Sequence, residues 1–434
     1  MAHATVPRFH ELRVQVKRRR IREGSVYPPS SSYRYATVVN ESSSWFQPRK
    51  ICQATCCAES VAISLYHEDE RIVNTIDGAD LADVRLVHYE PKPWQIFPSN
   101  ILNLDTLPCI QPGTIFFLEN HIKIILYFFD VVLPRIQVPF IMVTGKSDGN
   151  SPYPAFADVL YKDNPKVLKW YGTNALLPTT GRSPKKGMGK LVPMHLGLSQ
   201  RYNQEFFIRP YLELTNFTNP FWNKQPWLDL LKRPRVNGSV ISGTRDIFVH
   251  FGMDDKKKPQ RSSLWKVLCP QISRNRVSSC QTAKLETSDI YDASSRFRFG
   301  VSPPGMGWDC YRTYELLLLG IIPIVSGREV VADALFEGLP VIQLPDLFQI
   351  QSMQELEQKI EDYLRSDAFQ KATFDGWKRL FLGYWRRKIL HDAGRDHEIL
   401  QDKQGREYYQ AWKYTPANSE LIMCSQKGSC ELPK

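Results

Sequence analysis

Residues 297–325, FRFGVSPPGMGWDCYRTYELLLLGIIPIV, constrain the fold more than any other part of the chain. The alternating apolar run 297–301 predicts a short strand. A turn rich in Pro and Gly (302–307) follows, and then a leucine-rich helix that Gly320 ends. The apolar run 321–325 predicts a second, buried strand. In such a unit of strand, glycine loop, helix and strand, the helix N-terminus offers free N–H groups and a positive dipole end to an anion.

Two charged side chains in this unit, Arg312 and Glu315, indicate chemistry. Asp309 stands where it can cap the helix, and Arg312 and Glu315 lie one turn apart on one face. A cation near a helix start opposes the dipole, and a carboxylate among leucines is costly to desolvate, unless each is bound. A diphosphate on Arg312 and ribose hydroxyls on Glu315 would satisfy both. The spacing alone equally allows an Arg312–Glu315 salt bridge on a solvated edge of the helix.

The segment resembles the signature of the exostosin-like glycosyltransferases, SP-x-G-x-G-x-D-x-x-R-T-x-E-x-L-x-x-G-x-IPI. The match runs without a gap from Ser302 to Ile324, so chance is a poor explanation. Relatives often carry His and Trp where this chain has Tyr311 and Tyr314. This departure leaves the diphosphate interpretation intact and the donor sugar open. The resemblance implies an α/β protein with a GT-B fold, two Rossmann-like domains facing across a cleft, with the nucleotide-sugar held by the C-terminal domain.

A further arginine precedes this unit. Arg261 follows a strand-like run (245–252) and a charged loop, at the start of the helix-like segment 262–268. In the family an Arg at this place contacts the donor phosphates, and ligands of α/β folds bind at the carboxyl ends of strands. The alternative is an exposed arginine beside the three lysines 256–258. With Ser326, which follows the second strand, the candidate nucleotide-sugar site comprises Arg261, Ser302, Gly305, Gly307, Asp309, Arg312, Glu315 and Ser326.

Sugar transfer from a nucleotide diphosphate needs charge neutralisation on the leaving group and a base for the acceptor hydroxyl. The adjacent acidic pair 254–255 stands among lysines and is interpreted as solvated, so no metal site or other cofactor is expected. Arg312, Arg261 and the helix N-terminus would stabilise the diphosphate instead. Asp148 and Glu119, at the ends of predicted strands, are the candidate general bases, and His121 and His195 are weaker candidates.

The length of 434 residues suits two α/β domains. The expected division is a basic, disordered lead-in (1–50), an N-terminal acceptor domain (51–240), a C-terminal nucleotide-sugar domain (241–414) and a tail (415–434). Expected strands are 113–118, 140–145, 167–171 and 338–344, and expected helices are 122–133, 353–365 and 367–390. GT-B proteins have a C-terminal helix that crosses back to the first domain, and residues 406–412 are the candidate.

The cysteines and the targeting signals indicate different cellular compartments. Cys269 with Cys280, and Cys424 with Cys430, would close short disulfide loops in a lumenal protein and be thiols in the cytosol. Three N-x-S/T sequons, at Asn40, Asn216 and Asn237, fit a secretory location. The first 24 residues lack the apolar core of a signal peptide, and no segment approaches about 20 uninterrupted apolar residues. The resemblance implies the Golgi lumen, although the membrane anchor of its relatives is missing here.

The function expected from these observations is an inverting glycosyltransferase that moves a sugar from a UDP-sugar to a hydroxyl of a glycan or glycoprotein. One alternative is an inactive exostosin-like protein that binds glycans without turnover. A second is a nucleic-acid-binding protein, because Lys+Arg exceed Asp+Glu by 56 − 45 = 11. That second alternative lacks a recognisable nucleic-acid-binding module, so no nucleic-acid partner is expected.

Overall fold

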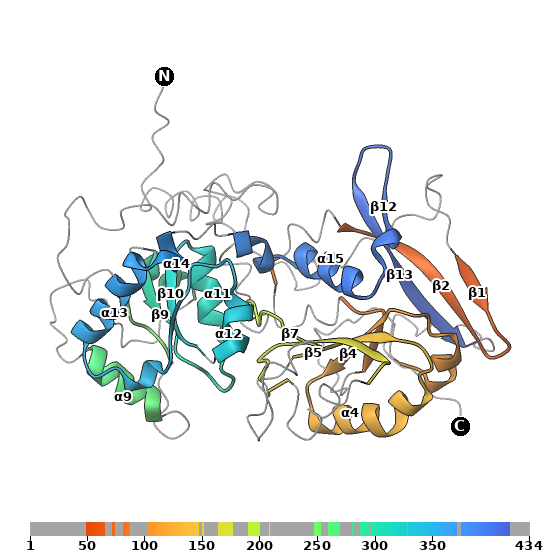
Figure 1. Ribbon diagram of the computed structural model, residues 1–434, viewed down its shortest axis with the longest axis horizontal. Helices are drawn as coiled ribbons and strands as arrows, with labels where there is room; N and C mark the ends of the chain where they lie inside the picture. Colours follow the sequence, from red (N-terminus) through yellow and green to blue (C-terminus); the bar gives the residue numbers. More distant parts are fainter. Residues whose placement is uncertain are drawn as a thin grey trace, which may run out of the picture.

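The computed structural model describes residues 49–65, 72–73, 81–86, 102–146, 150–151, 164–176, 190–199, 208, 247–252, 259–269, 280, 287–295, 297–327, 329–370 and 375–416. These residues form a mixed α/β structure with two parallel sheets and one antiparallel sheet. Figure 1 shows the two parallel sheets in different parts of the molecule, with β7, an edge strand of one sheet, on the side that faces the other. The expected α/β class is therefore confirmed.

The first parallel sheet, here called the N-terminal sheet, has the order β3-β4-β5-β6-β7. Its strands are β3 (Val84–Leu86), β4 (Thr114–Glu119), β5 (Phe140–Gly145), β6 (Val167–Gly172) and β7 (Leu191–Pro193). β5 is buried along its whole length, and β4 everywhere except at its last residue, because the sheet is covered on both faces. The predictions of strands at 113–118, 140–145 and 167–171 are confirmed.

One face of this sheet is covered by the helical segment after β4. It begins as α4 (Ile122–Tyr127) and continues as a π turn (Phe128–Val132) and a 3₁₀ turn (Leu133–Arg135), which confirms the predicted helix 122–133. The ring of Phe128 packs edge-on against Phe116 of β4 and Phe140 of β5, with ring centroids 5.7 and 5.9 Å apart. These aromatic contacts fix the helical segment on the sheet.

The second parallel sheet, the C-terminal sheet, has the order β11-β10-β9-β8. Its strands are β8 (Ile247–Phe248), β9 (Phe299–Val301), β10 (Ile322–Ser326) and β11 (Ile342–Leu344). Its helices are α9 (Pro259–Leu268), α10 (Thr287–Ser294), α11 (Tyr311–Leu318), α12 (Glu329–Phe336), α13 (Met353–Arg365) and α14 (Asp367–Gln370). Gly320 ends α11 with a φ of 67°, a conformation that favours glycine. The predicted unit of strand, glycine loop, helix and strand is confirmed as β9, α11 and β10.

The prediction of a helix at 406–412 is wrong. These residues belong mostly to β13 (Glu407–Pro416), which pairs antiparallel with β2 (Cys56–Ser64) in a sheet ordered β1-β2-β13-β12. The flanking strands are β1 (Lys50–Cys52) and β12 (Ile399–Gln401). The sequence EYYQAWKYT is rich in residues that favour strands, and Gly405, with a φ of 73°, turns the chain from β12 into β13.

The predicted helix 367–390 is also interrupted. It consists of α14, a 3₁₀ turn (Asp375–Leu380) and α15 (Leu382–Asp392), with residues 371–374 outside the described part. Gly376 lies against the backbone of Glu337 and Gly338, so that an added Cβ would come within 2.3 Å of the Glu337 carbonyl oxygen. This close approach of two backbones requires a turn rather than a continuous helix.

After α14 the chain returns to the N-terminal sheet. Leu382, Trp385, Ile389 and Leu390 of α15 share one hydrophobic cluster with Ile115, Ile141, Val143 and Tyr171 of that sheet. The Tyr171 hydroxyl also donates a hydrogen bond to Asp392. Figure 1 shows α15 beside the β12–β13 hairpin, above β4 and β5. Residues of the expected C-terminal domain therefore complete the core of the N-terminal one, and the expected boundary at residue 414 lies inside β13.

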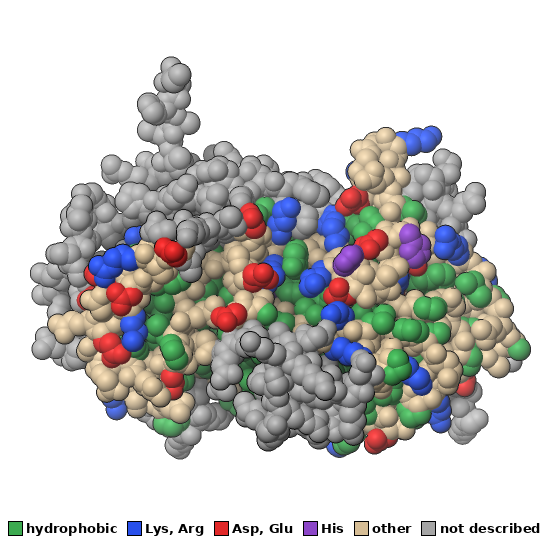
Figure 2. Space-filling view, viewed as in Figure 1, with side chains coloured by type: hydrophobic (Ala, Val, Ile, Leu, Met, Phe, Trp, Pro, Cys, Tyr) green, Lys and Arg blue, Asp and Glu red, His purple; other side chains and the backbone are tan. Residues whose placement is uncertain are grey.

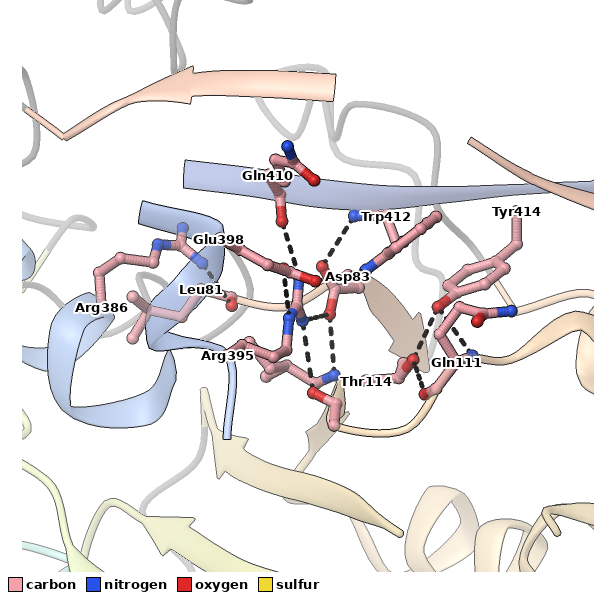
Figure 3. Close-up of polar contacts among 12 residues, drawn as sticks. Leu81, Asp83, Gln111, Thr114, Arg386, Arg395, Glu398, Gln410, Trp412 and Tyr414 are labelled. Atoms are coloured by element: carbon pink, nitrogen blue, oxygen red, sulfur yellow. Dashed lines mark hydrogen bonds and ion pairs between the residues drawn. The ribbon is translucent and has the colours of Figure 1, made fainter. Parts of the chain in front are cut away.

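A buried polar network fixes this return (Figure 3). The Arg395 guanidinium donates to Asp83 (2.6 Å), to Glu398 (2.7 Å) and to the carbonyl oxygen of Gln410 (2.7 Å). Asp83 also accepts from the backbone N–H of Trp412 at 3.1 Å. Arg395 and Asp83 are each only 2% exposed. The network joins the start of the N-terminal sheet to the last strand of the described chain.

Three disulfides link described cysteines: Cys52–Cys57, Cys56–Cys109 and Cys269–Cys280. The first two fasten β1 to β2, and β2 to the 3₁₀ helix Leu104–Cys109. The expected pairing of Cys269 with Cys280 is confirmed, whereas Cys424, Cys430 and the three sequons lie outside the described residues.

Within the described part of the chain, no helix has the length and apolar character that crossing a bilayer requires. On the face drawn in Figure 2, Lys and Arg side chains are interspersed with Asp and Glu, and hydrophobic side chains lie between them. Among the described side chains, the basic ones do not form a single patch on this face. This view therefore adds nothing to the nucleic-acid alternative.

We predict that Arg395→Met destabilises the protein by about 3–5 kcal/mol, because it leaves the carboxylates of Asp83 and Glu398 buried without their cation. Arg365→Met is the matched control, since Arg365 is 66% exposed and pairs only with exposed carboxylates. Urea denaturation of both variants measures the difference. Equal stabilities of the two variants would show that the network contributes no more than a surface pair.

Candidate functional site

A cavity of about 490 Å³ is lined by residues from both halves of the chain. Its wall is formed by Asn150, Leu176, Pro259, Gln260, Arg261, Pro304, Gly305, Met306, Gly307, Trp308 and Phe348. Asn150 and Leu176 belong to the segments that follow β5 and β6, and the other residues belong to the C-terminal half. The cavity is large enough for a small-molecule ligand.

The C-terminal contributions all follow carboxyl ends of parallel strands. The first turn of α9 comes after β8, the glycine loop (residues 303–308) follows β9, and the 3₁₀ helix Leu347–Gln349 with Phe348 follows β11. Ligands of open α/β sheets bind at this edge. The location of the cavity is therefore the one at which a parallel sheet is expected to hold a ligand.

Arg261 is the cation of this cavity. It is 7% exposed, and its guanidinium donates to the carbonyl oxygens of Pro304 (2.8 Å), Pro303 (2.8 Å) and Gly252 (3.2 Å). The alternative of an exposed arginine is therefore wrong. Among the residues that the structure describes, Arg261 has no carboxylate partner. Carbonyl dipoles orient the guanidinium without neutralising it, so its charge remains available to an anion.

The glycine loop is shaped by a bond of its own and by a bond to the helix that follows it. The Gly305 N–H donates to the Gly307 carbonyl oxygen at 2.8 Å, and both glycines line the cavity. Ser302 lies outside the cavity wall: its Oγ is buried and lies 2.9 Å from Thr313 Oγ1 of α11. Ser302 therefore fastens the start of the loop to the helix.

The expectation that Asp309 caps α11 is wrong. The helix begins at Tyr311, and its N-cap residue is Cys310, without a side-chain capping bond. The buried Asp309 carboxylate instead accepts from the backbone N–H groups of Cys310 (2.8 Å) and Leu196 (3.0 Å) and from the Tyr314 hydroxyl (2.6 Å). Leu196 follows β7, so this carboxylate joins the glycine loop to the N-terminal half. Desolvation by burial raises the pKa of Asp309 to about 6, although these hydrogen bonds oppose the shift.

Two more bonds hold the loop to the end of β6, and the sequence analysis missed both. The side-chain oxygen of Asn174 accepts from the Asp309 N–H at 3.0 Å, and Trp308 Nε1 donates to the Ala175 carbonyl oxygen at 2.9 Å. The available signal was an Asn in a Gly-Thr-Asn turn after a predicted strand, where a left-handed residue is common. Asn174 does adopt that conformation, with a φ of 51°.

Arg312 and Glu315 form the ion pair that their spacing allows, with Nη1 and Oε2 2.6 Å apart. Their side chains are 15% and 4% exposed, so the pair is largely buried rather than on a solvated edge. Burial raises the pKa of Glu315, and the charge of Arg312 opposes this shift. Neither residue is among those that line the cavity. Asp309 and Ser326 do not line the cavity either. Ser326 Oγ accepts from the N–H of Leu347, the residue before Phe348, at 3.1 Å.

The candidate bases take different positions. Glu119 ends β4 and lies 3.6 Å from the Lys146 ammonium, and His121 is the N-cap of α4. Both nitrogens of His195 lie 2.9 Å from carbonyl oxygens, those of Arg379 and Leu335, and burial lowers its pKa to about 3. These three residues do not line the cavity. Asp148 lies outside the described residues.

Metal ligands were sought in the described part of the chain, and no group of three or more His, Cys, Asp or Glu is placed to bind an ion there. The acidic pair 254–255 lies outside that part. Comparison of the sequence with protein-family models and with curated proteins gives no match.

The pKa of Asp309 gives a prediction for stability against pH. Because this pKa is raised from 3.8 to about 6 on folding, the folded protein binds more protons than the unfolded chain between these values. The contribution of Asp309 to the free energy of unfolding should therefore fall, by up to about 3 kcal/mol, as the pH rises from 4 to above 6.

Urea denaturation at intervals between pH 4 and pH 7 measures this effect as the difference between the wild type and Asp309→Asn. Asp362→Asn, at an exposed carboxylate on α13, serves as the control for the substitution itself. A difference for Asp309→Asn that does not change between pH 4 and pH 7 would contradict the raised pKa.

Proposed function

We propose that this protein is an exostosin-like glycosyltransferase of the GT-B type, which transfers a sugar with inversion from a UDP-sugar to a hydroxyl of a glycan or glycoprotein. In this proposal the two parallel sheets belong to two Rossmann-like domains that face each other across a cleft. The observation that carries the proposal is the cavity at the carboxyl ends of the C-terminal sheet, where the glycine loop meets a buried arginine without a carboxylate partner among the described residues.

The diphosphate of the donor would bind beside Arg261. Its guanidinium is held by carbonyl oxygens at 2.8 Å, so it is already oriented before the ligand arrives. As the bond between sugar and diphosphate breaks, negative charge grows on the leaving group. A fixed cation in a largely buried site stabilises that charge without having to reorganise.

The start of α9 would support the same anion. Pro259, Gln260 and Arg261 form its first turn, and all three line the cavity. The first N–H groups of a helix have no partner within it, and proline at the first position gives up only an N–H that the helix does not use. A diphosphate at this end would accept from free N–H groups and meet the positive end of the helix dipole.

The acceptor would enter from the side of the N-terminal half, where Asn150 and Leu176 line the cavity. Asp148 stands two residues before Asn150 in the chain and is the base that we propose, ahead of Glu119, which lies beside the Lys146 ammonium. Removing the acceptor proton from this side would let the hydroxyl attack the face of the sugar opposite the departing diphosphate.

A lumenal compartment, such as the Golgi, fits this proposal. The three disulfides among the described cysteines favour an oxidising environment, and glycans and glycoproteins are the acceptors that such a compartment offers. Phe348, Met306 and Trp308 make part of the wall apolar, which suits the ring faces of a base or a sugar.

We predict that UDP raises the thermal unfolding midpoint of the wild type in the presence of EDTA, because Arg261 and α9 supply the positive charge. Arg261→Met should weaken UDP binding by about 10- to 100-fold, the loss expected for a charge-assisted hydrogen bond. Lys266→Met is the matched control, with the same change of charge on an exposed residue at the other end of α9.

Isothermal titration of the three proteins with UDP gives these affinities. Equal weakening by both substitutions would point to general electrostatic attraction, and loss of the wild-type shift in EDTA would mean that a metal is needed. Hydrolysis of a UDP-sugar in the absence of an acceptor separates an enzyme from a glycan-binding protein without turnover.

Arg312→Met should weaken UDP binding less than Arg261→Met does, because the charge of Arg312 is already compensated by Glu315 at 2.6 Å. The resemblance gives Arg312 a diphosphate contact and Glu315 a ribose contact, so the ranking of the two arginines tests where the diphosphate lies. The same titration decides it. If Arg312→Met lost more UDP affinity than Arg261→Met, the result would indicate that the diphosphate binds at α11 and not at α9.

A further inference from the structure

The glycine loop that forms part of the cavity wall is held from the opposite half of the molecule. Three hydrogen bonds cross the junction: Asp309 N–H to Asn174, Trp308 Nε1 to Ala175, and Leu196 N–H to Asp309. Within the loop itself, the backbone bond is that from Gly305 to Gly307. The position of the loop therefore depends on residues that follow β6 and β7.

Asn174 makes the closest contact with the glycine loop at Gly307. A Cβ added to Gly307 would lie 2.3 Å from Oδ1, 2.5 Å from Cγ and 2.5 Å from Nδ2 of Asn174. The amide group therefore fills the space that a Cβ at position 307 would need, while its oxygen accepts from the Asp309 N–H two residues later. Only a residue without a side chain fits at position 307 in this arrangement.

Asn174 is itself fixed. It is 1% exposed, and its φ of 51° is a conformation that asparagine adopts more readily than most residues. A buried side chain on a constrained backbone presents its amide in one orientation. That orientation sets where Gly307 and Asp309 lie, and so how the loop meets Arg261, whose guanidinium binds the carbonyl oxygens of Pro303 and Pro304 in the same loop.

We infer that Asn174, a residue of the N-terminal half, is a positioning residue of the donor site: it sets the conformation of the glycine loop and thereby the affinity of the cavity for a nucleoside diphosphate. This inference rests on the proposed function for its ligand. Its first part, the ordering of the loop, concerns the ligand-free protein. The donor site is then built in part by a residue of the N-terminal half.

A double-mutant cycle tests the contact. Asn174→Gly keeps the left-handed backbone and removes the amide, and it should weaken UDP binding about 3- to 10-fold. Gly307→Ala in the wild type should weaken binding about tenfold or more, because its methyl group collides with the amide. In the double variant the collision is absent, so its affinity should equal that of Asn174→Gly alone rather than the product of the two losses.

Hydrogen exchange of the ligand-free protein distinguishes local loosening of the loop from a general loss of stability, because a general loss would change exchange rates throughout the protein. In Asn174→Gly the amide of Asp309 should exchange at least several-fold faster, while amides of β4 and β5 keep their wild-type rates. Asn103→Gly is the matched control, because Asn103 Oδ1 likewise accepts from a backbone N–H, that of Asp105 at 2.9 Å, in an exposed bond outside the cavity wall.

The outcomes separate the inference from the proposed function. Unchanged exchange at Asp309 in Asn174→Gly, or multiplying losses in the double variant, would overturn the positioning role. Failure of the wild type to bind UDP would overturn the proposed ligand, and with it the second part of the inference, while the exchange rates still decide the first part.

Discussion

The carboxylate of Asp309 is the group on which the arrangement of the candidate site depends. It accepts hydrogen bonds from both halves of the molecule, through Leu196 on one side and Cys310 and Tyr314 on the other. Burying a carboxylate is costly, and the three donors offset that cost only in part, since the pKa of Asp309 remains raised to about 6. The glycine loop, the start of α11 and the end of β7 therefore take their relative positions from one buried acid.

The hydrogen-bond partners of two buried arginines give them different roles. Arg395 lies between the carboxylates of Asp83 and Glu398, so its charge is consumed in joining the N-terminal sheet to the last strands of the chain. Arg261 is bonded to carbonyl oxygens and has no acidic partner among the described residues. The first arrangement fixes a fold, whereas the second orients a charge and leaves it available. Arg312 resembles Arg395 more than Arg261, because Glu315 already compensates it.

Local patterns predicted much of the framework. Apolar runs placed β4, β5 and β6, and the order of strand, glycine loop, helix and strand placed β9, α11 and β10. The errors have different sources. The helix at residues 406–412 was expected from the resemblance, whereas the residues of this segment favour a strand, and β2 pairs with them. The helix predicted over 367–390 is interrupted where Gly376 meets the backbone of residues 337–338, a long-range contact that local periodicity does not show. Asp309 was expected to cap α11, but the N-cap of that helix is Cys310, and the Asp309 carboxylate accepts in addition from the N–H of Leu196, which is distant in sequence.

The sequence by itself determined strands β4, β5 and β6, the unit of β9, α11 and β10, and the residue types at the candidate site: the paired glycines, the arginines and the acid after the loop. Periodicity and turn chemistry are local properties, so they can be read without knowing where the chain goes next. Only the tertiary structure decided which arginine faces the cavity, which pair is already neutralised, and that Asn174 from another part of the chain packs on Gly307. Charge compensation and steric contact depend on distances between segments far apart in sequence, and those distances arise only when the two halves pack together.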